Sequence, residues 1–187
     1  MASRQPSPGA LKTVEDFVNT LEIDGPARNE GLDSPAAAAR WLGEHGLMEA
    51  GAELGDDDRD LVVRVREDLR ALLLANNGEP LDDDSIVRLN EVAARASLSV
   101  RFTGPGDAHL ASTAQGIDGA LGRILAIVFT AMGDGTWERL KACRNEDCTW
   151  VFYDASKNLS ATWCSMRVCG NRMKARAYRR RRAEEHA

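Results

Sequence analysis

Residues 143–182, "CRNEDCTWVFYDASKNLSATWCSMRVCGNRMKARAYRRRR", contain all four cysteines of the chain and end in a dense run of arginine. Four residues separate Cys143 from Cys148, four separate Cys164 from Cys169, and fifteen lie between the two pairs. Zinc prefers four tetrahedral ligands, and two close pairs on either side of a hairpin can converge on one ion. The stretch therefore predicts one structural zinc ion bound by these four cysteines.

Two other states of the cysteines remain as alternatives, namely disulfide bonds and free thiols. A reducing compartment favours metal binding over disulfides. Four thiolates close the coordination shell, so the metal would have no open position for a substrate. No nucleophile, base and acid occur at a catalytic spacing elsewhere in the chain, and we therefore expect that the protein is not an enzyme.

The residues around the cysteines predict how the metal site is built. Trp150, Phe152 and the turn-prone "DASKN" at 154–158 indicate a hairpin, and Ser165 is placed to cap a helix that begins near Met166. A knuckle, a hairpin and a helix that supplies the second ligand pair form a treble-clef-like zinc finger. Apolar burial alone does not stabilise a module of this size, so its folding is expected to depend on the metal.

The segment after the last cysteine predicts a strongly basic helix. Seven of the eleven residues 172–182 are Arg or Lys, more than the helix dipole calls for, and their repulsion is relieved by a polyanion. Double-stranded DNA is the expected partner, because a helix fits its major groove. The candidate nucleic-acid contacts are Asn171, Arg172, Lys174, Arg176, Tyr178, Arg179, Arg180, Arg181 and Arg182.

Two other partners remain open at this stage. Trp150, Tyr153, Trp163 and Tyr178 would suit an RNA-binding protein, since aromatic rings stack on unpaired bases. Alternatively, the arginines would contact an acidic protein surface, which would make the chain a zinc-stapled interaction adaptor.

Charge divides the chain into two parts. Residues 1–140 carry 13 basic and 24 acidic residues, a net charge of −11, whereas residues 141–187 carry 11 and 5, a net charge of +6. We expect a disordered tail over 1–10, a helical domain over 11–135, and a zinc finger with its basic helix over 136–187. Opposite charges on the two parts also suggest that the acidic domain folds back on the arginines and weakens DNA binding.

Apolar spacing predicts mostly helical structure before the finger. Helices are expected over about 13–23, 34–46, 57–77, 83–96 and 117–132, with a polar loop over 24–33 and a β-hairpin within 98–113. The expected fold class is mainly α: a helical N-terminal domain with a small β-hairpin, plus a C-terminal treble-clef-like zinc finger that ends in a basic helix.

Hydropathy indicates no contact with a membrane. No run of consecutive apolar residues approaches the roughly 18 to 20 that a spanning helix requires. The N-terminal "MASRQPSPGA" lacks the apolar core of a secretion signal. We therefore expect a cytoplasmic protein.

Several motifs carry a resemblance to known families. "CTWVFYDAS" at 148–156, "WCSM" at 163–166 and "CGNR" at 169–172 resemble the CGNR zinc finger. "DFVNT" at 16–20 and "LDSPAAAARWL" at 32–42 resemble the ABATE domain of bacterial stress-induced transcription regulators. The resemblance implies zinc on the four cysteines and a DNA-binding role for the finger.

One loop departs from the family pattern. The family usually has extra arginines before "WCSM", where this chain has "SKNLSAT" at 156–162 with Lys157 as the single cation. If the loop touches phosphate in the family, this chain is expected to bind DNA less tightly or to depend more on its terminal helix.

The N-terminal domain is expected to sense a small-molecule effector, to form a homodimer or to contact polymerase. Asn19, beside the apolar face of the first helix, and Arg66 and Arg70, one turn apart on the third, mark a candidate ligand pocket. Ordinary explanations compete with it: a hydrogen-bonded amide for Asn19, and a solvated helix face for the two arginines.

Overall fold

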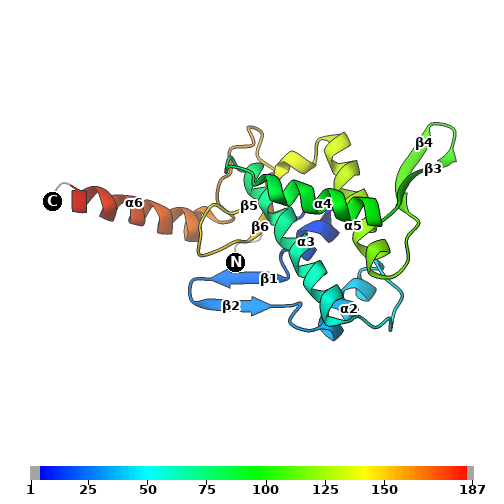
Figure 1. The fold of residues 1–187 in the computed structure, drawn as a ribbon. Helices are drawn as coiled ribbons and strands as arrows, with labels where there is room; N and C mark the ends of the chain where they lie inside the picture. Colours follow the sequence, from blue (N-terminus) through cyan, green and yellow to red (C-terminus); the bar gives the residue numbers. More distant parts are fainter. Residues whose placement is uncertain (1–4, 185–187) are drawn as a thin grey trace.

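The computed structural model describes residues 5–184, which form six α-helices and three two-stranded antiparallel hairpins (Figure 1). The elements before the finger are α1 (Leu11–Val18), β1 (Leu21–Asp24), β2 (Ala27–Glu30), α2 (Pro35–Glu44), α3 (Asp56–Ala75), α4 (Asp83–Arg95), β3 (Leu98–Gly104), β4 (Asp107–Ser112) and α5 (Gly116–Asp134). The finger follows with the 3₁₀ turn η1 (Trp137–Arg139), β5 (Leu140–Ala142), β6 (Val151–Tyr153), the π-helical turn η2 (Met166–Gly170) and α6 (Asn171–Glu184). The mainly α fold class is confirmed.

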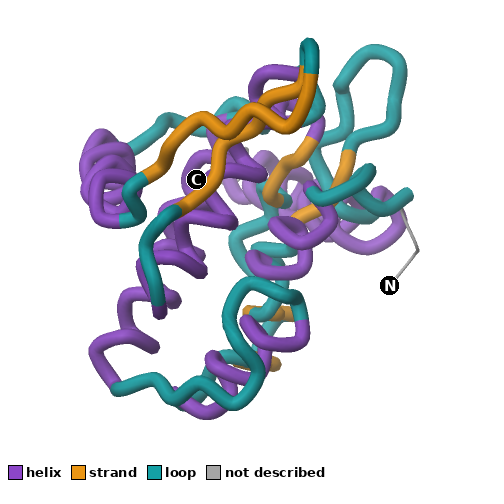
Figure 2. The backbone as a smooth tube through the Cα atoms, turned by 90° about the vertical axis from the view of Figure 1, so that its right-hand side faces the viewer, coloured by secondary structure: helices purple, strands orange, loops and turns teal. Residues whose placement is uncertain are grey.

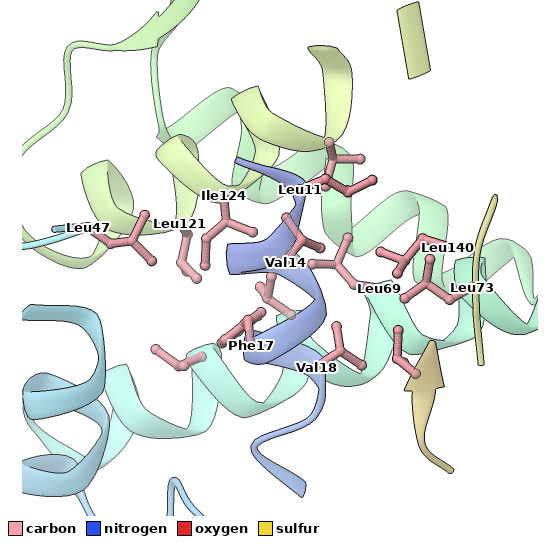
Figure 3. Close-up of a cluster of buried hydrophobic side chains, with 14 of the residues drawn as sticks. Leu11, Val14, Phe17, Val18, Leu47, Leu69, Leu73, Leu121, Ile124 and Leu140 are labelled. Carbon is pink, nitrogen blue, oxygen red and sulfur yellow. The ribbon is translucent and has the colours of Figure 1, made fainter. Parts of the chain in front are cut away.

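Helices α1, α3 and α5 form the centre of the core. Figure 3 shows α1 between the other two, with its apolar side chains pointing toward both. The i, i+3, i+4 spacing of apolar residues makes α1 amphipathic, and its buried residues are Leu11, Val14, Phe17 and Val18. Each fully buried side chain of this kind contributes about 1.5–3 kcal/mol to folding. The core thus holds the chain's shortest α-helix between its two longest.

The hairpin of the finger belongs to the same core. Leu140 of β5 and Val151 and Tyr153 of β6 are buried in the cluster formed by α1, α3 and α5. Alternate residues of a strand point to opposite faces, and Phe152, on the other face of β6, packs among the cysteines instead. One small hairpin therefore joins the helical domain to the metal site.

The first helix is shorter than predicted, and the polar loop after it is a strand pair. α1 ends at Val18, and β1 pairs with β2 from Leu21 opposite Glu30 to Asp24 opposite Ala27. Gly25 turns the chain at a φ of +63°, a conformation that glycine adopts without strain. The hairpin escapes a search for apolar periodicity, because a buried ion pair of Glu30 holds it rather than an apolar face.

The predicted hairpin within 98–113 is present as β3 and β4. Figure 2 is turned so that this side of the molecule faces the viewer, and it shows the hairpin standing out beside the helices. Val100 and Phe102 lie on one face of β3, and 57% and 82% of these residues is exposed.

Helix α5 is long and apolar enough to cross a membrane, by length and composition alone. The sequence prediction counted consecutive apolar residues and missed this, because small residues such as Gly119 and Gly122 interrupt the run. Half of the apolar window is buried inside the domain, where α5 packs against α1, α3, α4 and β4. Such packing is typical of the central helix of a helical domain.

The ends of the chain extend beyond the described residues. Of the predicted disordered tail, residues 1–4 lie outside them; in the remainder, Ser7 is buried and its backbone N–H donates a hydrogen bond to Glu15 Oε2 at 2.8 Å. Residues 185–187 of the predicted finger region also lie outside them. The domain boundaries therefore stay a prediction, although the left-handed Gly135 does end α5 next to the proposed division.

Candidate metal centre and nucleic-acid interface

The four cysteines converge, as their spacing predicts. Their Sγ atoms all lie within 4.8 Å of one another, with 3.5 Å between Cys148 and Cys164 and 3.6 Å between Cys164 and Cys169. Tetrahedral zinc at about 2.3 Å from each sulfur places the sulfurs about 3.8 Å apart, whereas a disulfide requires about 2.05 Å. The four buried thiols thus fit one structural zinc ion and are not disulfide-bonded.

The electrostatics of the cluster call for a cation. A hydrogen bond from the Cys148 thiol lowers the pKa of Cys143. The same contact raises the pKa of Cys148. Hydrogen bonds with Cys143 and Cys148 raise the pKa of Cys164. Crowded thiols cannot all ionise by themselves, because each thiolate repels the next. A bound zinc ion removes this limit, since its charge stabilises four thiolates at once.

Asn145, in the knuckle between Cys143 and Cys148, supports the metal site and was missed by the sequence analysis. The side chain is fully buried, and its Nδ2 donates to Cys169 Sγ at 3.5 Å. Its backbone oxygen accepts a hydrogen bond from Cys148 N at 2.8 Å, which closes the knuckle. Its position, as a polar residue between two ligand cysteines, could have indicated this role. Hydrogen bonds to metal-bound sulfur orient the ligands and tune the metal.

The second ligand pair lies where the helical segment begins. Ser165 Oγ accepts a hydrogen bond from Val168 N at 3.3 Å and caps the π-helical turn that carries Cys169, as predicted. A Cβ atom on Gly170 would lie 2.5 Å from Met166 Sδ and 3.1 Å from Trp163 Cδ1. The glycine of "CGNR" is therefore closely packed beside the metal site, and a larger residue would have to displace the half-exposed Met166 side chain.

A buried ion pair shapes the loop over residues 156–162. Lys141 Nζ donates to Asp154 Oδ2 at 3.0 Å, and both residues are almost completely buried. The backbone N–H groups of Ser156 and Ala161 also donate to the Asp154 carboxylate, at 3.0 and 2.9 Å. Burial alone would raise the pKa of Asp154, but these hydrogen bonds outweigh it and lower the pKa to about 2. The loop is thus folded around one carboxylate.

Helix α6 carries every predicted nucleic-acid contact and projects away from the rest of the molecule (Figure 1). Within residues 5–184, no carboxylate lies at salt-bridge distance from Lys174, Arg179 or Arg181. Tyr178 is 54% exposed, and the guanidinium of Arg182 lies 6.0 Å from the centre of its ring. The distal part of α6 is therefore a cationic surface open to solvent.

The base of α6 is different, because its arginines are paired. Arg172 Nη1 contacts Asp24 Oδ1 at the tip of the β1–β2 hairpin at 2.6 Å, and Arg176 contacts the carboxylate of Asp147 in the knuckle. A hydrogen bond joins the tip to the knuckle, from Gly25 N to Asp147 O at 3.0 Å. The acidic N-terminal domain thus reaches the base of the basic helix through Asp24.

The three residues of the predicted ligand pocket lie in internal contacts. Asn19 Nδ2 donates to the backbone oxygen of Val151, and Asn19 Oδ1 accepts from Val151 N. Arg66 and Arg70 are 1% and 4% exposed, so the expectation of a solvated helix face was wrong. Periodicity places both arginines on α3 but does not show the acceptors that bury them.

Those acceptors come from distant parts of the chain. Arg66 contacts both carboxylate oxygens of Glu30 at 2.5 and 2.8 Å, and also Thr20. Burial by itself raises the pKa of Glu30. The hydrogen bonds from Arg66 and from the Leu32 backbone, together with the positive charges of Arg66 and Arg59, outweigh burial and hold that pKa below its usual value. Arg70 donates to backbone oxygens of Val18 at 2.7 Å and Thr149 at 2.5 Å. The two arginines connect α1, α3, the β1–β2 hairpin and the zinc knuckle.

Of the three, Arg70 also lines a cavity of about 240 Å³ between α3 and the knuckle. The effector pocket stays a prediction.

A helical domain whose core incorporates a four-cysteine finger, followed by a projecting basic helix, defines a zinc-finger protein. Residues 139–182 match the CGNR zinc finger, and residues 11–134 match ABATE, a family described as "Putative stress-induced transcription regulator". The chain belongs to the ABATE family and carries a CGNR zinc finger, in the order that the resemblance implies. A comparison with curated proteins found no match.

Proposed function

We propose that the protein is a transcription regulator that binds double-stranded DNA through α6. The observation that carries the proposal is the exposed cationic surface of the distal half of α6, which projects from the body. Fourteen residues at about 1.5 Å each give a helix about 21 Å long, and the major groove of about 12 Å width admits it. Arginine and lysine supply contacts both to phosphates and to guanine edges.

Zinc has a structural part in this proposal. Cys143, Cys148, Cys164 and Cys169 hold the ion, which cross-links the knuckle to the turn that leads into α6. The four thiolates leave no coordination position open, and the metal therefore performs no catalysis. Its role is to fix the direction in which α6 leaves the body.

Duplex DNA is favoured over unpaired RNA by the positions of the aromatic residues. Trp150 and Trp163 pack against the cysteine cluster, and Tyr153 is buried in the main core. Tyr178 is the remaining candidate for stacking on a base, and it lies among the arginines. Single-stranded binding commonly uses several exposed rings in succession, a feature absent from this surface in the described residues.

The N-terminal domain is proposed as the input module, and the cytoplasm as the compartment where the protein meets DNA. The contacts of Arg66 and Arg70 support the assignment, because they join α3 to both the β1–β2 hairpin and the knuckle. An effector or a second copy that changes α3 would therefore act on the base of the DNA-binding helix.

The test is binding of the zinc-loaded protein to duplex DNA across a salt series. With about 4–6 phosphates engaged, log K falls against log[salt] with a slope of roughly −4 to −5. The matched protein is the Cys164→Ser, Cys169→Ser double variant, with zinc content measured for both, and binding should be lost in it. A duplex of random sequence and a single-stranded RNA of the same length serve as competitors.

Absence of DNA binding at low salt, with one zinc per chain, would contradict the proposal and favour the protein adaptor. Stronger binding to the RNA than to the duplex would favour an RNA-binding protein.

A further inference from the structure

Two carboxylates occupy the arginines at the base of the proposed DNA-binding helix. Asp24 lies 2.6 Å from Arg172, and Asp147 contacts Arg176. Arg172 and Arg176 are four residues apart and so share one face of α6. All four side chains keep 40–53% of their surface exposed, so the pairs are accessible to a ligand from solution.

A carboxylate and a phosphate use the same guanidinium donors. A DNA phosphate that approaches this face of α6 finds the donors taken and also meets two negative charges. Beyond this face, Arg179 and Arg181 have no such competitor among the described residues. The two halves of α6 are therefore unequal. In the basal half, Arg172 and Arg176 are held by acids from outside the helix. In the distal half, Arg179 and Arg181 are available for phosphate, and Arg180 lies 3.9 Å from Glu184 of the same helix.

We infer that Asp24 and Asp147 form an acidic gate, which DNA phosphates displace when the basal half of α6 binds. The inference rests on the proposed function, because the displacing ligand is the phosphate of bound DNA. With the gate closed, α6 binds through its distal arginines; with the gate open, Arg172 and Arg176 add two phosphate contacts.

The gate is mechanically tied to the N-terminal domain. Asp24 is at the tip of the β1–β2 hairpin, and Glu30, at the other end of the hairpin, is held by buried Arg66 of α3. The tip itself is bonded to the knuckle through Gly25 N and Asp147 O. A shift of α3 that moved Glu30 would move the base of the hairpin. The tip would follow, and Asp24 would move with it. The gate thus gives the proposed input module a route to the DNA-binding helix.

The test compares charge-matched variants of the full-length, zinc-loaded protein. Asp24→Asn and Asp147→Asn each remove a gate carboxylate. Glu22→Gln and Glu146→Gln remove a charge beside each position, and neither glutamate pairs with α6 within the described residues. Opening of an exposed pair should tighten binding to one duplex by about 1.5- to 5-fold at low salt. The controls should show a smaller gain, and all gains should fade as salt screens the charges.

A double-mutant cycle isolates the contact itself. Arg172→Ala should weaken binding only slightly in the wild-type background, because Asp24 already holds that side chain. In the Asp24→Asn background, Arg172→Ala should abolish the whole increase in DNA affinity that Asp24→Asn produces. Equal effects of Asp24→Asn and Glu22→Gln, or an additive cycle, would overturn the gate while leaving DNA binding intact. If no variant binds DNA, the proposed function fails and the gate falls with it.

Discussion

Asn19 and Val151, 132 residues apart, are joined by two hydrogen bonds: Asn19 Nδ2 donates to Val151 O at 2.9 Å, and Val151 N donates to Asn19 Oδ1 at 2.8 Å. The Asn19 carboxamide thus makes the same pair of hydrogen bonds to β6 that a residue of a neighbouring strand would make. Val151 is completely buried, and its backbone N–H and C=O lose these two partners when the amide is removed. One side chain of the helical domain thus completes the hairpin of the finger.

Replacement of Asn19 by Ala should therefore destabilise the whole protein. Two buried backbone groups would lose their partners, at a cost of about 1–3 kcal/mol for each unsatisfied group. Denaturant unfolding followed by circular dichroism measures the change. Asn90→Ala, at an exposed position of α4, is the matched control and should change stability by less than about 0.5 kcal/mol. Equal effects of the two substitutions would contradict the structural role of Asn19.

Removal of zinc should disturb the helical domain as well as the finger. Leu140 and Val151 flank the first cysteine pair in sequence and pack into the core of α1 and α3. When a chelator removes the metal, the loss of order should spread to these helices. Amide hydrogen exchange, compared between the zinc-loaded and zinc-free protein, should show reduced protection in α3. Unchanged protection there would mean that the finger unfolds as a separate unit.

The Asp154 carboxylate should make stability depend on pH in the acid range. Its pKa is about 2 in the folded protein, below the 3.8 of a free aspartate, so the folded state favours the ionised form. The contribution is complete above about pH 4 and disappears as the pH falls toward 2, and it amounts to about 2 kcal/mol. The difference in unfolding free energy between wild type and Asp154→Asn should accordingly shrink below pH 4.

At neutral pH the same substitution also leaves Lys141 buried without its counter-charge, which raises the cost to about 3–5 kcal/mol. Glu53→Gln, in an exposed loop, is the charge-matched control and should show no such loss. Acid releases zinc from both wild type and Asp154→Asn. The difference between their unfolding free energies therefore reports on the Asp154 carboxylate. A pH-independent difference would show that the carboxylate is not the titrating group.

A side chain at Gly170 should require Met166 and Trp163 to move. A methyl group there would meet the Trp163 ring and Met166 Sδ, but the Met166 side chain is half-exposed and can turn away. The cost of overpacking is therefore about 1 kcal/mol, at the low end of the usual range. Gly170→Ala should therefore lower both the melting temperature and the affinity for zinc, the latter measured by competition with a chromogenic chelator. Gly133→Ala in α5, where a methyl group would meet nothing within 4 Å, should be neutral or slightly stabilising. If both variants behave alike, packing does not explain the glycine of "CGNR".

The parts of the fold that depend on local spacing were predictable. The cysteine pairs, the Ser165 cap and the long helices follow from residues close together in the sequence, and each is present. The β1–β2 hairpin was not predictable from local spacing, because its support is the pair of Glu30 with Arg66, 36 residues away.

The burial of Arg70 had the same non-local origin. Arg70 has one local acceptor, Glu67 one turn before it, but two others are the backbone oxygens of Val18 and Thr149, 52 and 79 residues distant. A charged residue on a helix is ordinarily solvated, and only the tertiary fold shows that carbonyl groups have been brought around it. The same limit concealed the acidic gate, since Asp24 reaches Arg172 across 148 residues.

The projection of α6 resolves an apparent conflict, in that an acidic protein is proposed to bind an anion. Arg182 lies ten residues beyond Arg172, or about 15 Å farther along the helix axis. That length is nearly two Debye lengths at physiological ionic strength. Dissolved ions therefore screen the charges at the end of α6 from those of the acidic domain. A helix that projects into solvent can thus present positive charge although the whole protein carries a net negative charge.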